Sequence, residues 1–258
     1  MFSVLAPALA PALMSHLSLR HLSLALGGQH ILSDVSFDVA EGEVIGLIGP
    51  NGSGKTTLFN VLSGFLKSDN GSIHFKDADI TRFSPSERAR IGIGRVFQNF
   101  GIFRDMTLEE NVLVALEALP REQREVLGNL REVVAGTLDM VGLKGHAKKK
   151  AGSLSGGQMR LLEIARTLKS GKELFLLDEP TAGVSPKMTG EVAGLIGALK
   201  KEGKTVLIVE HDLPFIAKIC DRVIVLDVGK IVLMGSPNEV KHSKELQTIY
   251  FGSSTSSL

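Results

Sequence analysis

Short apolar runs alternate along the chain with longer segments in which apolar residues recur every three or four positions. The short runs are rich in β-branched residues and predict strands, whereas the longer segments predict amphipathic helices. The predicted strands are 17–24, 35–39, 44–48, 72–75, 94–97, 174–178, 205–209, 222–227 and 230–235. The predicted helices are 55–63, 85–91, 108–118, 121–141, 156–169, 186–202 and 213–219. This alternation is typical of an α/β fold with a largely parallel sheet.

One stretch breaks the alternation. Between residues 98 and 167, three helical patterns follow one another with no convincing strand between them, which indicates a helical insertion. A chain of 258 residues is long enough for one domain with such an insertion. We therefore expect a single domain over 15–252, with a core formed by about 15–97 and 168–252 and a helical subdomain over about 98–167.

The N-terminal residues need a separate interpretation. Up to residue 19 the chain contains no Lys, Arg, Asp or Glu, so a signal peptide or membrane anchor must be considered. Against this, the basic start of a signal peptide is missing, and Pro7 and Pro11 would interrupt a helix. Met14 could equally be the translation start. We expect residues 1–14 to be a disordered extension and the polar residues 253–258 to be a disordered tail.

Composition narrows the function little. The 29 basic and 28 acidic side chains balance, so no overall field suggests binding to nucleic acid or to an acidic membrane surface. The single cysteine, Cys220, excludes an internal disulfide and fits a reducing compartment. A buried, unreactive thiol is a more ordinary interpretation of it than a reactive one. No other apolar run approaches the length of a membrane-spanning helix, so we expect a soluble, cytoplasmic protein.

The most informative pattern is G-x-x-x-x-G-K-[ST], which follows the predicted strand 44–48. It is formed by Gly49, Pro50, Asn51, Gly52, Ser53, Gly54, Lys55 and Thr56, hereafter the phosphate loop. The glycines allow a tight turn whose N–H groups converge on one anion, and the helix that follows adds its positive end. Lys55 suits the β- and γ-phosphates, and the Thr56 hydroxyl suits Mg²⁺. A chance glycine-rich turn is the alternative.

Two further strands end in polar residues. The apolar strand 174–178 delivers Asp178 and then Glu179 to its carboxyl end. Asp178 can join the Mg²⁺ shell, and Glu179 can polarise a water in line with the γ-phosphate. Strand 205–209 is followed in the same way by His211, which can contact a γ-phosphate oxygen. Solvated acids and a structural histidine are the alternatives.

Gln98 stands where the helical insertion begins. Its side-chain carbonyl can contact Mg²⁺ or the attacking water, while its backbone can act as a hinge. A solvated surface glutamine is the alternative, and sequence spacing does not decide between them.

Five consecutive residues between the phosphate loop and the predicted strand 174–178 resemble the signature segment of ATP-binding-cassette (ABC) ATPases. They are Leu154, Ser155, Gly156, Gly157 and Gln158, hereafter the signature segment. The resemblance covers about 17–252 in the family's motif order, and it implies a P-loop NTPase (RecA-like) core with an N-terminal antiparallel β region and an inserted helical subdomain. It also implies that the signature segment caps the γ-phosphate bound by a second subunit, so that two ATPs lie in a head-to-tail dimer.

The resemblance assigns roles to individual residues. The phosphate loop and Thr57 bind the phosphates, and Asp178 belongs to the Mg²⁺ site together with Thr56 and Gln98. Glu179 is the general base, His211 the switch and Gln98 the hinge.

Two positions depart from the family's pattern. Leu26 stands where an aromatic residue usually stacks on adenine, which puts that stacking in doubt. Ser185 stands where an Asp usually reaches across the dimer, so it can supply a hydrogen bond but no charge.

Several segments resemble the ATPases of branched-chain amino-acid importers. They are 64–66, 89–99, 106–112, 162–166 and 249–252. The lipopolysaccharide-export ATPase shares many of these features and remains the alternative. The implied partners are a second ATPase subunit, identical or related, and two transmembrane permease subunits, with no nucleic acid. For an importer, the resemblance also implies a separate substrate-binding protein. The implied location is the cytoplasmic face of the membrane.

The permease needs a contact surface on this chain. Phe100, Ile102 and Phe103 form an apolar cluster after Gln98, and they are our candidates for a groove that receives a cytoplasmic permease helix. The alternative is that they pack within the insertion.

Two other classes of function stay open. A soluble ABC ATPase for cofactor assembly would bind soluble partners, whereas one for DNA maintenance would need a long coiled coil that this sequence lacks. A non-catalytic nucleotide-binding regulator would not need both Glu179 and His211.

Overall fold

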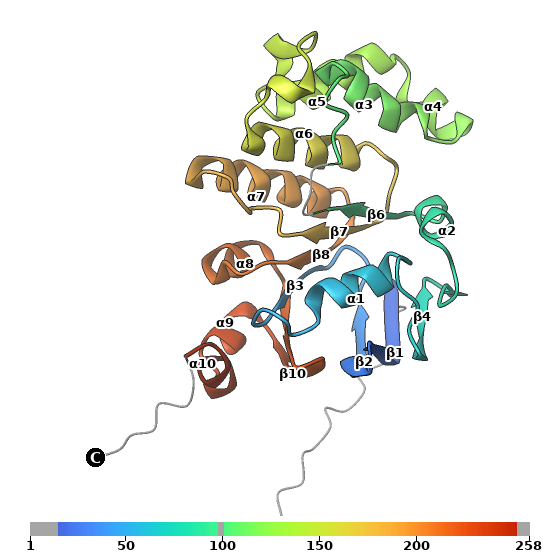
Figure 1. The fold of residues 1–258 in the computed structure, drawn as a ribbon. Coiled ribbons are helices and arrows are strands. Elements are labelled where there is room, and N and C mark those ends of the chain that lie inside the picture. The colour runs from blue at the N-terminus through green and yellow to red at the C-terminus, as the bar shows by residue number, and fades with distance from the viewer. Residues whose placement is uncertain (1–14, 98–100, 252–258) are drawn as a thin grey trace, which may run out of the picture.

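The computed structural model describes residues 15–97 and 101–251, with the backbone alone at 250 and 251 (Figure 1). The predicted extension 1–14, the predicted tail 253–258, Gln98 and Phe100 lie outside the described residues. The predictions for these positions therefore stay predictions.

The described strands form two sheets. The smaller sheet is antiparallel, in the order β2-β1-β4-β5. Its strands are β1 (Leu17–Leu26), β2 (Gln29–Val39), β4 (Asn70–Phe75) and β5 (Ala78–Asp79). It corresponds to the antiparallel β region expected near the N-terminus.

The larger sheet has the order β10-β9-β3-β8-β7-β6 and is parallel apart from β10. Its strands are β3 (Val44–Ile48), β6 (Ile93–Val96), β7 (Leu174–Asp178), β8 (Thr205–Val209), β9 (Arg222–Asp227) and β10 (Lys230–Gly235). Every residue of β3, β7 and β8 is buried, which is why these strands are continuous apolar runs rather than alternating ones.

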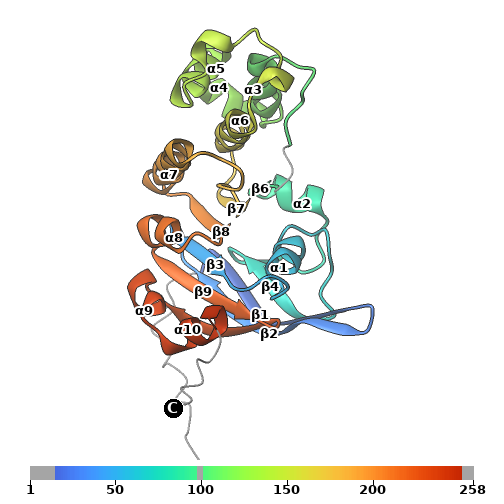
Figure 2. The same cartoon turned by 60° about the vertical axis from the view of Figure 1, so that its left-hand side comes forward.

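Successive side chains of the central strands enter two different cores. Val44 and Ile48 of β3 lie in one apolar cluster, whereas Ile45 and Leu47 lie in the other. Helices α7 (Pro186–Lys201) and α8 (Leu213–Ile219) cover the first face, and α1 (Lys55–Leu62) covers the second (Figure 2). The period of two along each strand thus builds a three-layer α/β unit.

Between β6 and β7 the described chain is helical. The helices there are α3 (Leu108–Glu117), α4 (Arg121–Leu127), α5 (Leu130–Met140), the short 3₁₀ turns Lys144–His146 and Ala151–Ser153, and α6 (Gly156–Leu168). In Figure 1 helices α3, α4 and α5 lie at the end of the molecule opposite β1 and β2, with α6 between them and the sheet. The insertion therefore extends one end of the α/β unit.

The single helix predicted over 121–141 is wrong. The helix is interrupted between α4 and α5 at Gly128, which has φ +67° and ψ −120°. Asn129 then caps α5, because its side chain accepts a hydrogen bond from the N–H of Arg131. An Asn after a Gly is a stop followed by a start signal. The continuous heptad-like spacing of apolar residues concealed it.

The remaining helices are α2 (Pro85–Arg90), α9 (Pro237–Lys241) and α10 (Lys244–Phe251). The last two were not predicted. Ser236 and Glu239 form a capping box at the start of α9, with Pro237 in its first turn. Serine followed by proline and by glutamate three residues later is a sequence-level start signal that would have found this helix.

Cys220 is buried beside α8, and burial raises the pKa of its thiol to about 12. The interpretation as an ordinary buried cysteine fits this environment. In the described part of the chain, no helix combines the length and the apolar character needed to cross a bilayer.

Candidate functional site

The register of three parallel strands brings the polar motifs to one edge of the sheet. Leu47 of β3 and Asp178 of β7 are both paired with Val209 of β8. The residues that follow each strand therefore emerge side by side. They surround a cavity of about 270 Å³ whose described lining consists of Ile31, Asn51, Gly52, Gly54, Lys55, Thr56, Thr57, Glu179 and His211.

The phosphate loop is held tightly against the sheet at its first glycine. Gly49 has φ +151°, and a Cβ there would lie 2.0 Å from the carbonyl oxygen of Leu226. By contrast, Gly52 has φ +80° with open space around it. The first position thus requires glycine for lack of room, and the second for its backbone conformation alone.

Lys55 begins α1, and its side chain bonds back to the start of the phosphate loop. Its ammonium donates to the carbonyl oxygens of Gly49 and Pro50 at 2.7 and 2.8 Å. Burial lowers the pKa of Lys55, while the nearby carboxylates of Glu179 and Asp178 act to raise it. The cation is thus fixed where the loop turns, next to the cavity.

The amino end of α1 faces the same cavity. Gly54 is its N-cap and provides no side chain for capping, and the first turn contains no acidic residue. Helix amino ends carry N–H groups without intrahelical partners and a partial positive charge. This end of α1 is therefore suited to an anion such as a phosphate.

Asp178 is only 4% exposed and is paired with Arg95 of β6. The Arg95 Nη2 lies 2.9 Å from Asp178 Oδ2, and its Nη1 donates to Asn60 and Ser63 of the α1 segment. One carboxylate oxygen of Asp178 is therefore fixed by a charge-assisted bond. Our sequence reasoning did not assign this role to Arg95; an arginine inside a predicted buried strand was the only signal for it.

Glu179 and His211 meet directly. His211 Nε2 lies 2.6 Å from Glu179 Oε1. The backbone of Glu179 has φ +47°, a left-handed conformation that is uncommon outside glycine, and its N–H donates to Val209 O at 3.0 Å. Strained residues of this kind cluster at functional sites, where the surroundings hold them in place.

A third acid, Glu210, follows β8 and bonds both to the turn after Glu179 and to His211; the sequence did not assign it a role. It is 3% exposed, and its carboxylate accepts hydrogen bonds from Thr181 and from the His211 N–H. A glutamate that directly follows a buried strand is usually exposed to solvent, so the sequence alone gave no reason to single out Glu210.

The signature segment forms the start of α6. Ser155 is the N-cap, and it exchanges bonds with Gln158 in a capping box. A Cβ at Gly157 would lie 2.4 Å from Met188 Sδ, so a methyl there would displace the flexible end of that side chain on α7. Leu154 is buried and Gly156 is exposed. The described lining of the cavity contains none of the signature residues.

The two residues that depart from the family's pattern, Ser185 and Leu26, both lie at the end of a secondary-structure element. Ser185 is the N-cap of α7, where its hydroxyl accepts from the Met188 N–H. Leu26 ends β1 and is 42% exposed. Ile31 is the apolar side chain that the described lining of the cavity contains, and no Phe, Tyr or Trp is among those residues.

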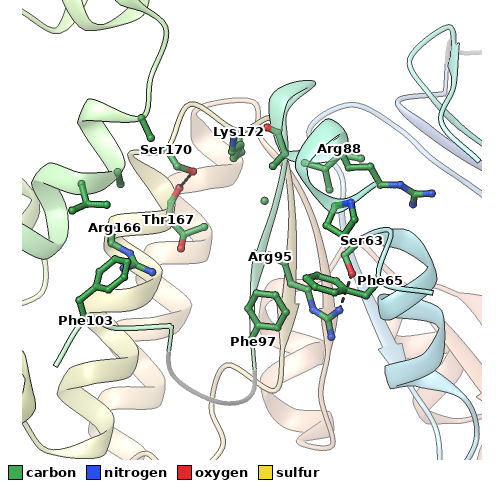
Figure 3. Close-up of a pocket in the computed structure, with 17 residues that line it drawn as sticks. Ser63, Phe65, Arg88, Arg95, Phe97, Phe103, Arg166, Thr167, Ser170 and Lys172 are labelled. Carbon is green, nitrogen blue, oxygen red and sulfur yellow. Dashed lines mark hydrogen bonds between the residues drawn. The ribbon is translucent and has the colours of Figure 1, made fainter. Parts of the chain in front are cut away.

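A second hollow, of about 400 Å³, lies between the sheet and the helical insertion (Figure 3). Phe65 and Phe97 meet there edge to face with ring centroids 5.6 Å apart, and the Arg166 guanidinium lies over Phe103 at 5.4 Å. Phe103 is 46% exposed, whereas Ile102 is buried in the core. We call this hollow the aromatic groove.

Comparison with known proteins fits this geometry. Residues 32–182 match the family model described as "ABC transporter". The chain belongs to the ABC transporter family of ATPases. It is an ATP-binding, ATP-hydrolysing cassette, as its motifs predicted.

Two curated relatives resemble this ABC ATPase along most of its length. The high-affinity branched-chain amino acid transport ATP-binding protein LivG of Salmonella typhimurium is 36% identical over 252 residues, which is 92% of this chain and 97% of LivG. The lipopolysaccharide export system ATP-binding protein LptB of Acidithiobacillus ferridurans is 40% identical over 230 residues, which is 86% of this chain and 90% of LptB.

Two solved structures share the fold. The ADP conformation of MJ1267, an ATP-binding cassette of an ABC transporter, has a TM-score of 0.81 and 34% identity, covering 93% of this chain and 99% of that one. A dimeric post-hydrolysis cassette, MJ0796 with ADP and Pi, has a TM-score of 0.74 and 28% identity, covering 86% and 98%. The predicted fold class is thereby confirmed.

The tight contact at Gly49 gives the first test. We expect Gly49→Ala to destabilise this ABC ATPase by about 3 kcal/mol, because the new methyl overlaps the Leu226 carbonyl. The matched variant Gly52→Ala has open space and should cost only the backbone term, about 1 kcal/mol. Urea unfolding monitored by circular dichroism measures both. Equal losses would contradict the packing argument.

Proposed function

We propose that this ABC ATPase hydrolyses ATP to drive import of branched-chain amino acids, or of related amino acids and amides, through two membrane permease subunits. The observation that carries the ATPase site is the convergence of Lys55, Glu179 and His211 on one cavity. Likeness to LivG over nearly its whole length supports the class of cargo.

Nucleotide phosphates would bind at the phosphate loop and Thr57. The α1 amino end offers N–H donors, and the Lys55 ammonium can exchange its bonds to Gly49 and Pro50 for phosphate oxygens. The base end of the nucleotide would meet the aliphatic side chain of Ile31 rather than an aromatic ring. Contact of this kind discriminates weakly between bases, since it lacks stacking and edge-reading groups.

The residues present fit Mg²⁺. The Thr56 hydroxyl and the second oxygen of Asp178 are hard oxygen donors, and Mg²⁺ is usually held by one or two such groups together with substrate phosphates. Arg95 keeps the Asp178 carboxylate oriented. By the family resemblance Gln98 would join them. The ion would neutralise charge on the phosphates.

Glu179 would act as the general base. Water attacks the γ-phosphorus, the bond to the β–γ bridging oxygen breaks, and the proton lost by the water passes to the Glu179 carboxylate. His211 holds one oxygen of that carboxylate at 2.6 Å, which orients the other for the water. His211 also lies close enough to the cavity to contact the γ-phosphate, as a switch residue would.

The signature segment would serve a second subunit. Ser155, Gly156 and Gly157 begin α6 and offer another helix amino end to phosphate. ATP held between two chains favours the closed dimer, and hydrolysis removes that bridge. The dimeric MJ0796 cassette supports such an arrangement. Ser185, at the start of α7, would add an uncharged hydrogen bond across the dimer.

The aromatic groove is our proposed contact for a permease. Its exposed rings suit the apolar face of a short cytoplasmic helix, and Arg166 can pair with an acidic residue on that helix. Phe103 lines this groove and is 46% exposed, which supports a role in the contact, whereas Ile102 is buried and is not part of the proposal. This contact would place the chain peripherally on the cytoplasmic face of the membrane.

Lipopolysaccharide export is the second candidate. The 40% identity to LptB exceeds that to LivG, although it covers less of the chain. Both candidates require the same ATPase cycle and differ in the permease that is bound. The partner protein therefore decides the cargo.

The role of Glu179 can be tested directly. We expect Glu179→Gln to lower kcat at least about 100-fold while keeping ATP affinity, because only the proton acceptor is lost. The variant should accumulate as an ATP-bound dimer in size-exclusion chromatography. Glu191→Gln, an exposed change on α7, is the control. Phosphate release by Glu179→Gln at the parent rate would remove Glu179 from the base role.

The groove gives a separate test. We expect Phe103→Asp to abolish transport in reconstituted vesicles, because a charge on this surface opposes docking of an apolar helix. ATP affinity of the isolated chain should stay within about twofold. The control is Val126→Asp, an 87% exposed change on α4 outside the groove. Loss of ATP affinity in Phe103→Asp would instead indicate misfolding.

The whole assignment is tested by affinity purification of tagged Glu179→Gln chain from detergent-solubilised membranes with ATP. We expect two multi-spanning proteins and a second ATPase subunit, identified by mass spectrometry. Amino-acid permeases would support import, and a lipopolysaccharide-export pair would support the second candidate. Recovery only from the soluble fraction, with soluble partners, would overturn the transport function and favour cofactor assembly.

A further inference from the structure

We propose that Glu210 is a positioning residue that fixes the geometry of the Glu179–His211 pair. The inference rests on the proposed roles of those two residues. Glu210 itself does not line the described cavity, so it would act through its neighbours rather than on the nucleotide.

Glu210 is bonded to both loops that carry the pair. Its Oε1 accepts from the Thr181 N–H at 2.8 Å and from the Thr181 hydroxyl at 2.6 Å. Its Oε2 accepts from the His211 N–H at 3.1 Å. Thr181 is two residues after Glu179, and His211 is the next residue after Glu210. The carboxylate thus closes a ring whose other link is the 2.6 Å contact between Glu179 and His211.

The three partners all donate. A carboxylate has acceptor sites on both oxygens, so it satisfies all of them at once. No salt bridge to Glu210 is present within 15–97 and 101–251, so hydrogen bonds alone compensate its burial there. A glutamine would turn one end into an NH₂ donor that faces another donor. Buried donors that face each other without an acceptor cost stability, and we expect the loops that carry Thr181 and His211 to separate to relieve this conflict.

Strain at Glu179 explains why such a tie is needed. Its φ of +47° is unfavourable for a residue with a side chain, and it persists only when the surroundings determine it. The Glu179 N–H to Val209 bond holds one side of the turn, and the Ala182 N–H to Glu179 O bond closes it. Bonds from Thr181 to Glu210 anchor the rest of that turn to β8. Without them the backbone at Glu179 can relax and move its carboxylate.

The experiment compares Glu210→Gln with Thr181→Val in the full chain. Thr181→Val keeps the shape and the N–H but removes the hydroxyl donor. We expect kcat for ATP to fall at least about 10-fold in Glu210→Gln and about 3-fold in Thr181→Val, with KM and nucleotide affinity within about twofold. The double variant should lose no more than Glu210→Gln alone, because both changes break the same link.

Two further comparisons separate the possible failures. In a Glu179→Gln background, Glu210→Gln should lower kcat no further, since both act through the same carboxylate. Glu43→Gln is the control: it weakens a partly buried pair with Arg222 at the opposite end of β3 and should lower stability while leaving kcat unchanged.

The proposal would be overturned by an unchanged kcat in Glu210→Gln, or by a kcat loss that follows loss of folded protein in urea titrations, as a merely structural carboxylate would give. Thr181→Val, a milder change, keeps the test valid if Glu210→Gln does not fold. If Glu179→Gln itself keeps the parent kcat, the proposed base role fails first, which is a separate result.

Discussion

The site depends on the register of β3, β8 and β7. Because Leu47 and Asp178 are paired with the same residue of β8, Val209, three loops distant in sequence leave the sheet at one edge. Parallel strands buried on both faces have little freedom to shift, since a slip of one residue would exchange the two apolar cores. The cavity is therefore positioned by three strands that are buried along their whole length.

Charges near that cavity are held by partners from separate elements. Arg95 ties Asp178 to the α1 segment, and Glu210 ties the turn after Glu179 to the residue that carries the imidazole. The buried carboxylates of Asp178 and Glu210 both accept hydrogen bonds, as a low-dielectric interior requires. The result is a preorganised set of acids whose orientations are fixed before nucleotide arrives.

The sequence predicted those strands and motifs that depend on a local pattern of residues. Strands β3, β7, β8, β9 and β10 were predicted with their observed bounds, because continuous apolar runs and flanking turns mark them. The phosphate loop and the acids at the end of β7 were found because their chemistry lies in consecutive residues.

Contacts between distant segments were not found, since the sequence around Arg95 and Glu210 does not indicate which distant residues they bond to. The helix break at Gly128 was missed because the spacing of apolar residues continued through it. The roles of individual site residues, Gln98 among them, stay predictions.

The bonds of Lys55 to its own loop have a consequence for turnover. Two backbone carbonyls accept from two of the three N–H donors of the ammonium, so a phosphate that takes more than one of these donors competes with an internal ligand. The free energy of phosphate binding at Lys55 is then the difference between two hydrogen-bonded arrangements of a buried ammonium, and not the full strength of an ion pair. When product leaves, the two carbonyls can take its place, so the ammonium keeps hydrogen-bond acceptors. A loop that competes with its own ligand in this way favours exchange over retention, which suits a machine that must release nucleotide in every cycle.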